Sequence, residues 1–187
     1  MRVLTILFAA IWLSSCSVYQ LVKPGNVKIG DAFSVHTDVA WSKVESGKTE
    51  SWTIDGLGLQ ALQFTKGLEH GETLYNQQHV NAKSSLPKFT KDMSPLEMKD
   101  FIVASSVAIG ALKIREENFE PIKIGTQRAY RADFRYTMED GLERLGFAIG
   151  FVKDEKLYLI MYTGAALHYY PLRKDDVDRL LETVKIL

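Results

Sequence analysis

The sequence predicts an α+β domain, namely a curved antiparallel sheet of about six or seven strands flanked by a central helix and a C-terminal helix. Several segments on both sides of residue 94 alternate apolar with polar side chains, which is typical of half-buried antiparallel strands. A helix-capping motif begins a central segment, and apolar residues recur with helical spacing near the C-terminus. Strands and helices segregated in this way indicate the α+β class.

The first half of the chain predicts an antiparallel meander. Phe33, Val35, Val39 and Trp41 recur at even spacing and indicate a strand. Polar, glycine-containing turns then separate the strand segments of this half, which are residues 33–44, 51–56 and 59–68.

A central helix is predicted from Ser94 onward. Ser94 and Glu97 form a capping box, and Pro95 occupies the first helical position. Apolar residues that follow fit one broad helical face. Gly110 is a candidate end, although residues 111–117 could extend the helix.

The second half returns to strands and then closes with a helix. Residues 129–137 place Tyr130, Ala132, Phe134 and Tyr136 on one face and Arg131, Asp133 and Arg135 on the other. The charged face is either a set of self-neutralising pairs or a surface for a partner. Two further parts complete the prediction, a hairpin of residues 144–152 and 156–164 and a helix within residues 173–187.

The N-terminal segment predicts an export signal. Arg2 precedes an apolar run over residues 3–13, which would give about 16 Å of helix, too short for a hydrocarbon core of about 30 Å. A basic start, an apolar stretch of this length and small residues after it are typical of a secretory signal peptide. A buried N-terminal helix is the alternative.

Leu13-Ser14-Ser15-Cys16 resembles the lipobox of bacterial lipoproteins. The resemblance implies a signal peptide over residues 1–15, lipid on the Cys16 sulfur, and anchoring in a membrane by acyl chains such as palmitate. Ser17 after the cysteine favours the periplasmic face of the outer membrane by the same resemblance. We therefore expect three parts: residues 1–15 as signal, 16–30 as lipidated cysteine and short tether, and 31–187 as a single α+β domain.

Composition excludes some classes of function. The 187 residues hold 23 basic and 23 acidic side chains, and removal of the leader with Arg2 leaves one net negative charge. A nucleic-acid-binding domain would show a basic excess, so no nucleic-acid partner is expected. Cys16 is the single cysteine, so the fold is expected to stand without disulfides.

The sequence assembles no catalytic, cofactor or metal site. Its four histidines include no pair at helical ligand spacing, and there is no Gly-x-Ser-x-Gly nucleophile motif. His168 and Tyr169 follow the predicted hairpin, where loop residues often line a cleft. Together with Trp52 and Asp55, they are the candidate residues for a partner or ligand cleft.

The order of these segments resembles that of bacterial lipoproteins with a PsbP-like fold, a fold shared by an extrinsic photosystem II subunit and a Ran-binding nuclear import factor. The resemblance rests on residues 52–56, 67–74 and 156–162, the capped central helix and the short final helix. It implies a non-enzymatic envelope lipoprotein that serves another envelope component, protein or glycan, as a binding or accessory module.

The alternative is a carrier of a small apolar molecule or lipid in a cavity between the sheet and the Ser94 helix. A third class, an envelope hydrolase, would need acid and base groups that converge only in three dimensions.

Overall fold

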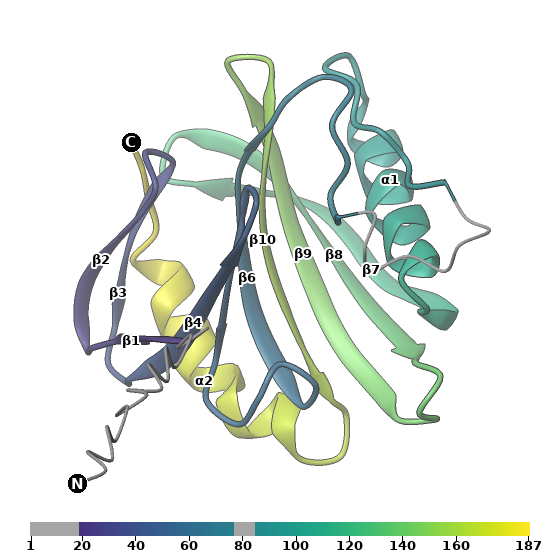
Figure 1. Cartoon of the computed structure of the whole chain (residues 1–187). Coiled ribbons are helices and arrows are strands. Elements are labelled where there is room, and N and C mark those ends of the chain that lie inside the picture. Colours follow the sequence, from purple (N-terminus) through teal and green to yellow (C-terminus); the bar gives the residue numbers. More distant parts are fainter. Residues whose placement is uncertain (1–18, 77–84) are drawn as a thin grey trace, which may run out of the picture.

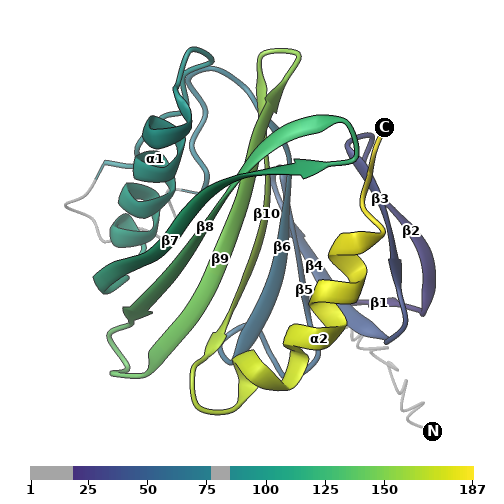
Figure 2. The ribbon, with the colours of Figure 1, turned by 180° about the vertical axis from the view of Figure 1, so that it is seen from behind.

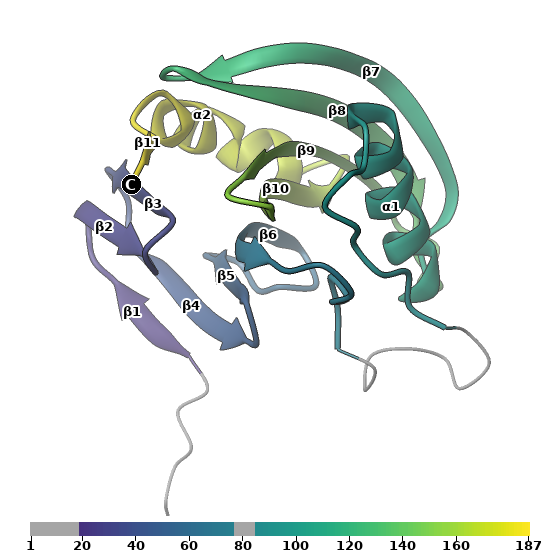
Figure 3. The same ribbon diagram turned by 90° about the horizontal axis from the view of Figure 1, so that it is seen from above.

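The computed structural model describes residues 19–76 and 85–187, and it confirms the α+β class (Figure 1). An eight-stranded antiparallel sheet forms most of the domain, and Figure 3 shows its curvature from above. Its strands, in spatial order, are β1 (Gln20–Val22), β4 (Trp41–Ser46), β5 (Thr49–Thr53), β6 (Gln60–Leu68), β10 (Lys156–Ala165), β9 (Glu143–Lys153), β8 (Gln127–Thr137) and β7 (Leu112–Ile124). A smaller sheet holds three strands: β11 (Lys185–Ile186), β3 (Phe33–Thr37) and β2 (Gly25–Ile29).

Each face of the large sheet is covered by a different helix. On one face, Leu62 and Ile160 belong to a core shared with Val177 and Leu180 of α2 (Tyr169–Glu182) and with the small sheet. Figure 2 shows α2 lying against this face. On the opposite face, side chains such as Met161 pack in a second core with Met98 and Phe101 of α1 (Pro95–Ala108). Side chains that alternate along the strands therefore pack into two separate cores, one on each face of the large sheet.

The predicted capping box of α1 is confirmed. The Ser94 backbone N–H donates to Glu97 Oε2 at 2.7 Å, and the Glu97 backbone N–H donates to Ser94 Oγ at 3.3 Å. The possible extension of the helix over residues 111–117 is wrong. Gly110 adopts a φ of 102°, which ends the helix, and β7 begins at Leu112.

The N-terminal segment differs from the expected tether. Residues from Gln20 onward pair in both sheets, because β1 pairs with β4 and β2 pairs with β3. Val22 and Ile29 are buried in the core, and this apolar burial explains why the segment forms part of the domain rather than a free tether.

The closing helix also has different bounds from those predicted. It begins at Tyr169 instead of residue 173 and ends at Glu182. The residues after it form β11, which pairs with β3. The buried Val184 faces the core in this last segment.

The predicted faces of β8 are confirmed. Ala132 and Phe134 are buried on the α1 side. On the charged face, Arg131 makes a bidentate pair with Asp133, at 2.7 Å from Nη2 to Oδ1 and 3.2 Å from Nε to Oδ2. Arg135 binds Glu117 of β7 and Glu143 of β9 across the strands. These charges neutralise one another within the sheet, as one of the two interpretations expected.

Candidate functional site

A cavity of about 670 Å³ lies between α1 and the large sheet. Its roof is the C-terminal half of α1 with the residues that follow, and its floor is the α1-facing side of β6, β10, β9 and β8. Its lining includes Ala61, Tyr75, Ser106, Tyr136, Arg144, Gly146, Ala148 and Thr163.

Small side chains at neighbouring positions of the sheet create this space. Strand pairing places Ala61, Thr163 and Gly146 side by side in one row across β6, β10 and β9. The next row contains Ala148 opposite Met161. A larger residue at Ala61 or Ala148 would fill the volume, since side chains on one face of adjacent strands stand next to each other.

The spacing of the two helices explains why the cavity is on the α1 side. The α2 backbone lies close to β10 and β3, whereas no strand within the described ranges comes as close to α1. Ile102 and Val103 of α1 line the cavity rather than filling it. The roof is thus held away from the small residues of the floor.

Arg144 provides a cation among the lining residues. Its Nη1 donates to the Gly58 carbonyl oxygen at 2.5 Å, and its Nη2 lies 2.8 Å from Asp140 Oδ2. The side chain is 11% exposed, and Nε is buried without an acceptor among residues 19–76 and 85–187. Asp140 and Glu139 also line the cavity. The cavity therefore combines an apolar interior with charged residues contributed by the β8–β9 connection and the start of β9.

Two tyrosines bring phenol groups to the cavity. Burial, together with the neighbouring Tyr136, raises the pKa of Tyr75 to about 12, and hydrogen bonding with Ser106 offsets a small part of that shift. Burial also raises the pKa of Tyr136, against the effects of a Thr163 hydrogen bond and the Arg144 charge. Both phenols are consequently uncharged at neutral pH and available for hydrogen bonding.

Backbone hydrogen bonds tie three connections together at this end of the sheet. The Ala165 N–H donates to the Leu59 carbonyl oxygen, and the Ala166 N–H donates to the Glu143 carbonyl oxygen, each at 2.9 Å. These bonds join the β5–β6, β8–β9 and β10–α2 connections. Exposed leucines occur on all three, namely Leu57, Leu142 and Leu167.

The four residues that the sequence suggested as a cleft are placed elsewhere. Trp52 is fully buried in the α2-side core, where its Nε1–H donates to Glu50 Oε1 at 2.8 Å. Asp55 pairs with Arg173 of α2 at 3.3 Å. His168 precedes α2 and is exposed, and its ring lies 5.0 Å from the ring of Tyr169, centroid to centroid. None of these four described residues lines the α1 cavity.

Sequence reasoning did not identify Tyr75, Tyr136 and Arg144 as site residues. Tyr136 carried a usable signal, because it lies on the apolar face of a predicted strand and yet bears a hydroxyl group. Tyr75 and Arg144 gave no comparable signal, since their places at the cavity depend on strand pairing and on the route of the β6–α1 connection.

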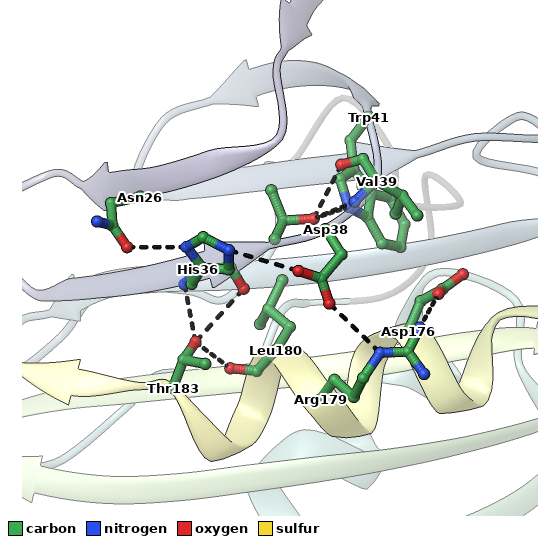
Figure 4. A network of polar contacts seen from close by, with 10 residues as sticks. Asn26, His36, Asp38, Val39, Trp41, Asp176, Arg179, Leu180 and Thr183 are labelled. Atoms are coloured by element: carbon green, nitrogen blue, oxygen red, sulfur yellow. Dashed lines mark hydrogen bonds and ion pairs between the residues drawn. The ribbon is translucent and has the colours of Figure 1, made fainter.

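A polar network around His36 fastens the small sheet to α2 (Figure 4). The His36 ring contacts Asn26 Oδ1 at 3.0 Å and Asp38 Oδ1 at 3.4 Å, and its backbone N–H donates to Thr183 Oγ1 at 2.7 Å. Asp38 in turn pairs with Arg179 of α2 at 3.4 Å. These contacts connect structural elements.

No group of three or more His, Cys, Asp or Glu side chains is placed to hold a metal ion within residues 19–76 and 85–187. His79 lies outside these ranges.

A second hollow, of about 650 Å³, lies between α2 and the β7–β8 hairpin. Its ionisable lining residues are Glu120, Lys123, Arg131, Asp133, Lys174 and Glu182, three acidic and three basic. Six charged side chains line this hollow, against three in the α1 cavity, so it is less suited to an apolar ligand. The α1 cavity is therefore the stronger candidate site.

Comparison with known proteins supports the fold. No family model and no curated protein matches the sequence. The structure is similar to cyanobacterial PsbP (CyanoP) from Synechocystis sp. PCC 6803, with a TM-score of 0.53 and 12% identity over 96% of this chain and 99% of that chain. A Bacteroides thetaiotaomicron VPI-5482 protein gives a TM-score of 0.50 and 11% identity over 89% of this chain and 49% of that one, so this chain spans about half its length. The fold is thus PsbP-like.

LpqN of Mycobacterium tuberculosis, described as involved in cell envelope biogenesis, has a TM-score of 0.38 and 9% identity over 90% of this chain and 83% of that chain. At that TM-score the likeness carries no argument about function. Cys16, the predicted lipid attachment residue, and the predicted signal peptide lie outside the described residues. Among residues 19–76 and 85–187, no helix has the length and apolar character needed to cross a membrane.

Proposed function

We propose that this chain is a lipid-anchored envelope protein that binds a small, largely apolar molecule in the α1 cavity. The cavity itself carries the proposal. Its volume of about 670 Å³ falls within the range of roughly 300–1,000 Å³ that is usual for small-molecule sites. Its small-residue floor and apolar roof favour a hydrocarbon or ring system, while Tyr75, Tyr136 and Arg144 provide a few groups for orientation.

The envelope location rests on the leader. The lipobox-like residues ending in Cys16 support lipid attachment and a membrane partner through that lipid, and Ser17 favours the periplasmic face of the outer membrane. Cys16→Ala is expected to abolish acylation and to move the protein from the membrane fraction to the soluble fraction. Metabolic labelling with an alkyne analogue of palmitate measures this, and a labelled Cys16→Ala protein would contradict the assignment.

The ligand proposal is tested with the mature chain, residues 16–187, carrying Cys16→Ser so that no attached lipid competes. The fluorescent probe N-phenyl-1-naphthylamine is expected to bind with increased emission. Ala148→Leu places three additional carbons in the cavity and is expected to remove this binding. It should not destabilise the domain, because burial of each added carbon is favourable by up to about 0.8 kcal/mol where space exists.

Ala166→Leu is the matched control, since it makes the same change in the β10–α2 connection outside the cavity lining. It is expected to leave probe binding unchanged. Native mass spectrometry of the protein recovered from its own envelope should show a retained small molecule. A ligand-free spectrum together with equal probe binding by Ala148→Leu and wild type would refute the carrier function.

A second proposed role is that of an accessory module for another envelope component, protein or glycan. The exposed leucines on the three joined connections, Leu57, Leu142 and Leu167, favour it, because apolar surface of this kind is typical of contact sites. A photo-crosslinking residue at position 142 should capture a partner in intact cells, whereas one at the exposed Asp31 should not. Equal labelling from both positions, or none, would argue against this role.

A further inference from the structure

Exposed apolar side chains gather at one end of the large sheet. Strand pairing defines this end, because Gly164 of β10 lies beside Gln60 of β6, and Thr137 of β8 lies beside Leu112 of β7. The last turn of α1 and the first turn of α2 adjoin it in the chain. Six large apolar residues are exposed there, and we call them the apolar end: Leu57, Val107, Leu112, Leu142, Leu167 and Leu172.

The other end of the sheet has much less exposed apolar surface. Within residues 19–76 and 85–187, the remaining exposed large apolar side chains are Tyr19, Leu21, Leu96 and Leu187. Tyr19 and Leu21 belong to the β1 region, whereas Leu96 lies in the first turn of α1, and Leu187 binds Lys153 at the far end of β9. The exposed apolar surface of the domain is therefore one-sided, which is typical of a contact site.

The α1 cavity opens at the apolar end. The exposed members of its lining are Leu57, Gly58, Glu139 and Asp140, and they lie in the β5–β6 and β8–β9 connections. The other lining residues are buried or half-buried. Any surface that covers the apolar end therefore also meets the mouth of the cavity.

The charges of the apolar end are balanced. Three carboxylates contact arginines, with Asp55 3.3 Å from Arg173, Asp140 2.8 Å from Arg144 and Glu143 2.9 Å from Arg135. The exposed Glu139 and Lys113 carry opposite charges. Electrostatic attraction to a strongly charged partner is therefore weak, and apolar contact is the main interaction that this end offers.

The N-terminus leaves the domain near the same end. Leu21 of β1, Ser42 of β4 and Thr53 of β5 form one row, so Leu21 lies about 10 Å from the end of β5 at two strand spacings. Thr53 Oγ1 accepts a hydrogen bond from the Gly56 N–H of the β5–β6 connection at 2.9 Å. Figure 1 shows β1 in the lower half of the domain, toward the three connections.

The chain between Cys16 and β1 is short. β1 begins at Gln20, and four residue steps of 3.3–3.6 Å span at most about 14 Å. A domain of this size has a radius of gyration of about 15 Å. A lipid on Cys16 would therefore hold the β1 side of the domain at the surface of the bilayer.

We propose that the apolar end docks on the lipid bilayer that holds the Cys16 anchor, with its leucines among the headgroups and upper acyl chains and the cavity mouth at the membrane surface. This inference rests on the proposed lipid anchor and specifies which surface faces the membrane. It assigns Leu57, Leu142 and Leu167 to lipid rather than to a protein partner, and it makes the bilayer the source of the apolar ligand.

The test reproduces the anchor chemically. The mature chain, residues 16–187, is coupled through Cys16, its single cysteine, to maleimide-bearing lipid in vesicles of phosphatidylcholine and phosphatidylethanolamine. Benzoylphenylalanine then replaces one leucine at a time, and lipid adducts are counted by mass spectrometry after illumination. Positions 142 and 167 are expected to capture lipid at least about tenfold more than positions 96 and 187, because the ten residues of β10 separate the two ends by about 33 Å.

A pair of matched double variants tests the contribution of the leucines. With benzoylphenylalanine at position 57, Leu142→Ser/Leu167→Ser is expected to lower lipid capture about tenfold, since burial of one leucine already corresponds to about that factor. Leu96→Ser/Leu187→Ser removes two exposed leucines from the other end and should leave capture unchanged. Urea unfolding of both double variants checks that each remains folded.

The outcomes separate this inference from the proposals on which it builds. Lipid capture that is equal at all four positions, or absent, would overturn docking by the apolar end. Capture of a protein from position 142 in cells, without capture of lipid in vesicles, would also overturn it in favour of the accessory role. The anchor and the cavity are judged independently, by palmitate labelling of Cys16 and by dye binding to the soluble Cys16→Ser chain.

Discussion

Ionisation of Tyr75 offers a direct measure of how deeply the polar end of the cavity is buried. Burial raises the pKa of its phenol to about 12 in the folded chain, against 10.0 for the free side chain. A group whose pKa is raised on folding contributes stability that is complete below the unfolded pKa and is lost as the pH rises through the folded value. For Tyr75 the loss should therefore begin near pH 10 and finish above pH 12.

The size of the effect follows from the shift. About two pKa units at 1.36 kcal/mol each give about 2.7 kcal/mol of unfolding free energy, lost at about 1.4 kcal/mol per pH unit between pH 10 and 12. Tyr75→Phe removes this contribution and leaves the aromatic packing. The difference in unfolding free energy between wild type and variant, measured in urea at half-unit steps from pH 8 to 12, should be constant below about pH 9.5 and should change by most of that amount by pH 12.

Tyrosines that are not coupled to Tyr75 ionise in both proteins and cancel in this comparison, whereas Tyr136 is coupled to it. The principal tyrosines that cancel are Tyr170 and Tyr162. Burial raises the pKa of Tyr170 to about 12, and burial also raises the pKa of Tyr162. Absorbance at 295 nm gives a second measure, because one phenolate of high pKa should be absent from the titration of Tyr75→Phe. A constant stability difference over the whole range, or loss of a phenol that titrates near pH 10, would refute the reasoning.

Three substitutions test other parts of the structure by urea unfolding at pH 7.5. Ser94→Ala removes the N-cap of α1 and should lower the free energy of unfolding by about 1 kcal/mol. Ser94→Asp keeps a capping side chain and should retain the wild-type stability. An equal loss in both variants would contradict a capping role. Trp52→Phe removes the indole N–H that donates to the buried Glu50 at 2.8 Å, and it should lower the free energy of unfolding by about 1–3 kcal/mol. An unchanged free energy of unfolding would contradict this expectation. Gly146→Ala would place a Cβ 2.9 Å from both Thr163 Cγ2 and the Tyr162 carbonyl oxygen, and it should lower the free energy of unfolding by about 1–3 kcal/mol. Gly58→Ala is the control and should not show this loss, because no atom lies within 4 Å of the added Cβ.

Local chemistry explains which elements could be predicted. Ser94, Pro95 and Glu97 act within one helical turn, so the start of α1 follows from neighbouring residues. The β9–β10 hairpin was predictable for the same reason, because apolar alternation flanks a polar turn in which Asp154 and Glu155 adopt positive φ angles of 50° and 60°.

Elements that depend on distant pairing were missed or misplaced. β7 is exposed along most of its length, contains Pro121 and lies at the edge of the sheet, so its residues show no apolar alternation. Its strand character comes from pairing with β8. The early start of α2 lacked a signal as well, because His168 at its N-cap makes no side-chain capping hydrogen bond.

In the candidate site, too, the features that depend on strand pairing could not be predicted from the sequence. A cavity between the sheet and the Ser94 helix was one of the hypotheses drawn from the sequence, and the structure contains a cavity in that place. Its lining could not be foreseen, because Ala61, Gly146 and Thr163 become neighbours only through strand register. Trp52 was one of the four residues predicted for a cleft, and it is instead buried by packing against Trp41 and Phe64.

The roof of the cavity is built from a single helix that holds its place through side-chain packing, whereas the floor is locked by continuous strand pairing. Substitutions at Ile102, Val103 and Ser106 change the shape and polarity of the cavity without altering the register of any strand. The shape of the roof and the register of the sheet are therefore encoded by largely separate residues. Evolution or protein engineering can reshape the cavity by changing one helix face while the strands stay as they are.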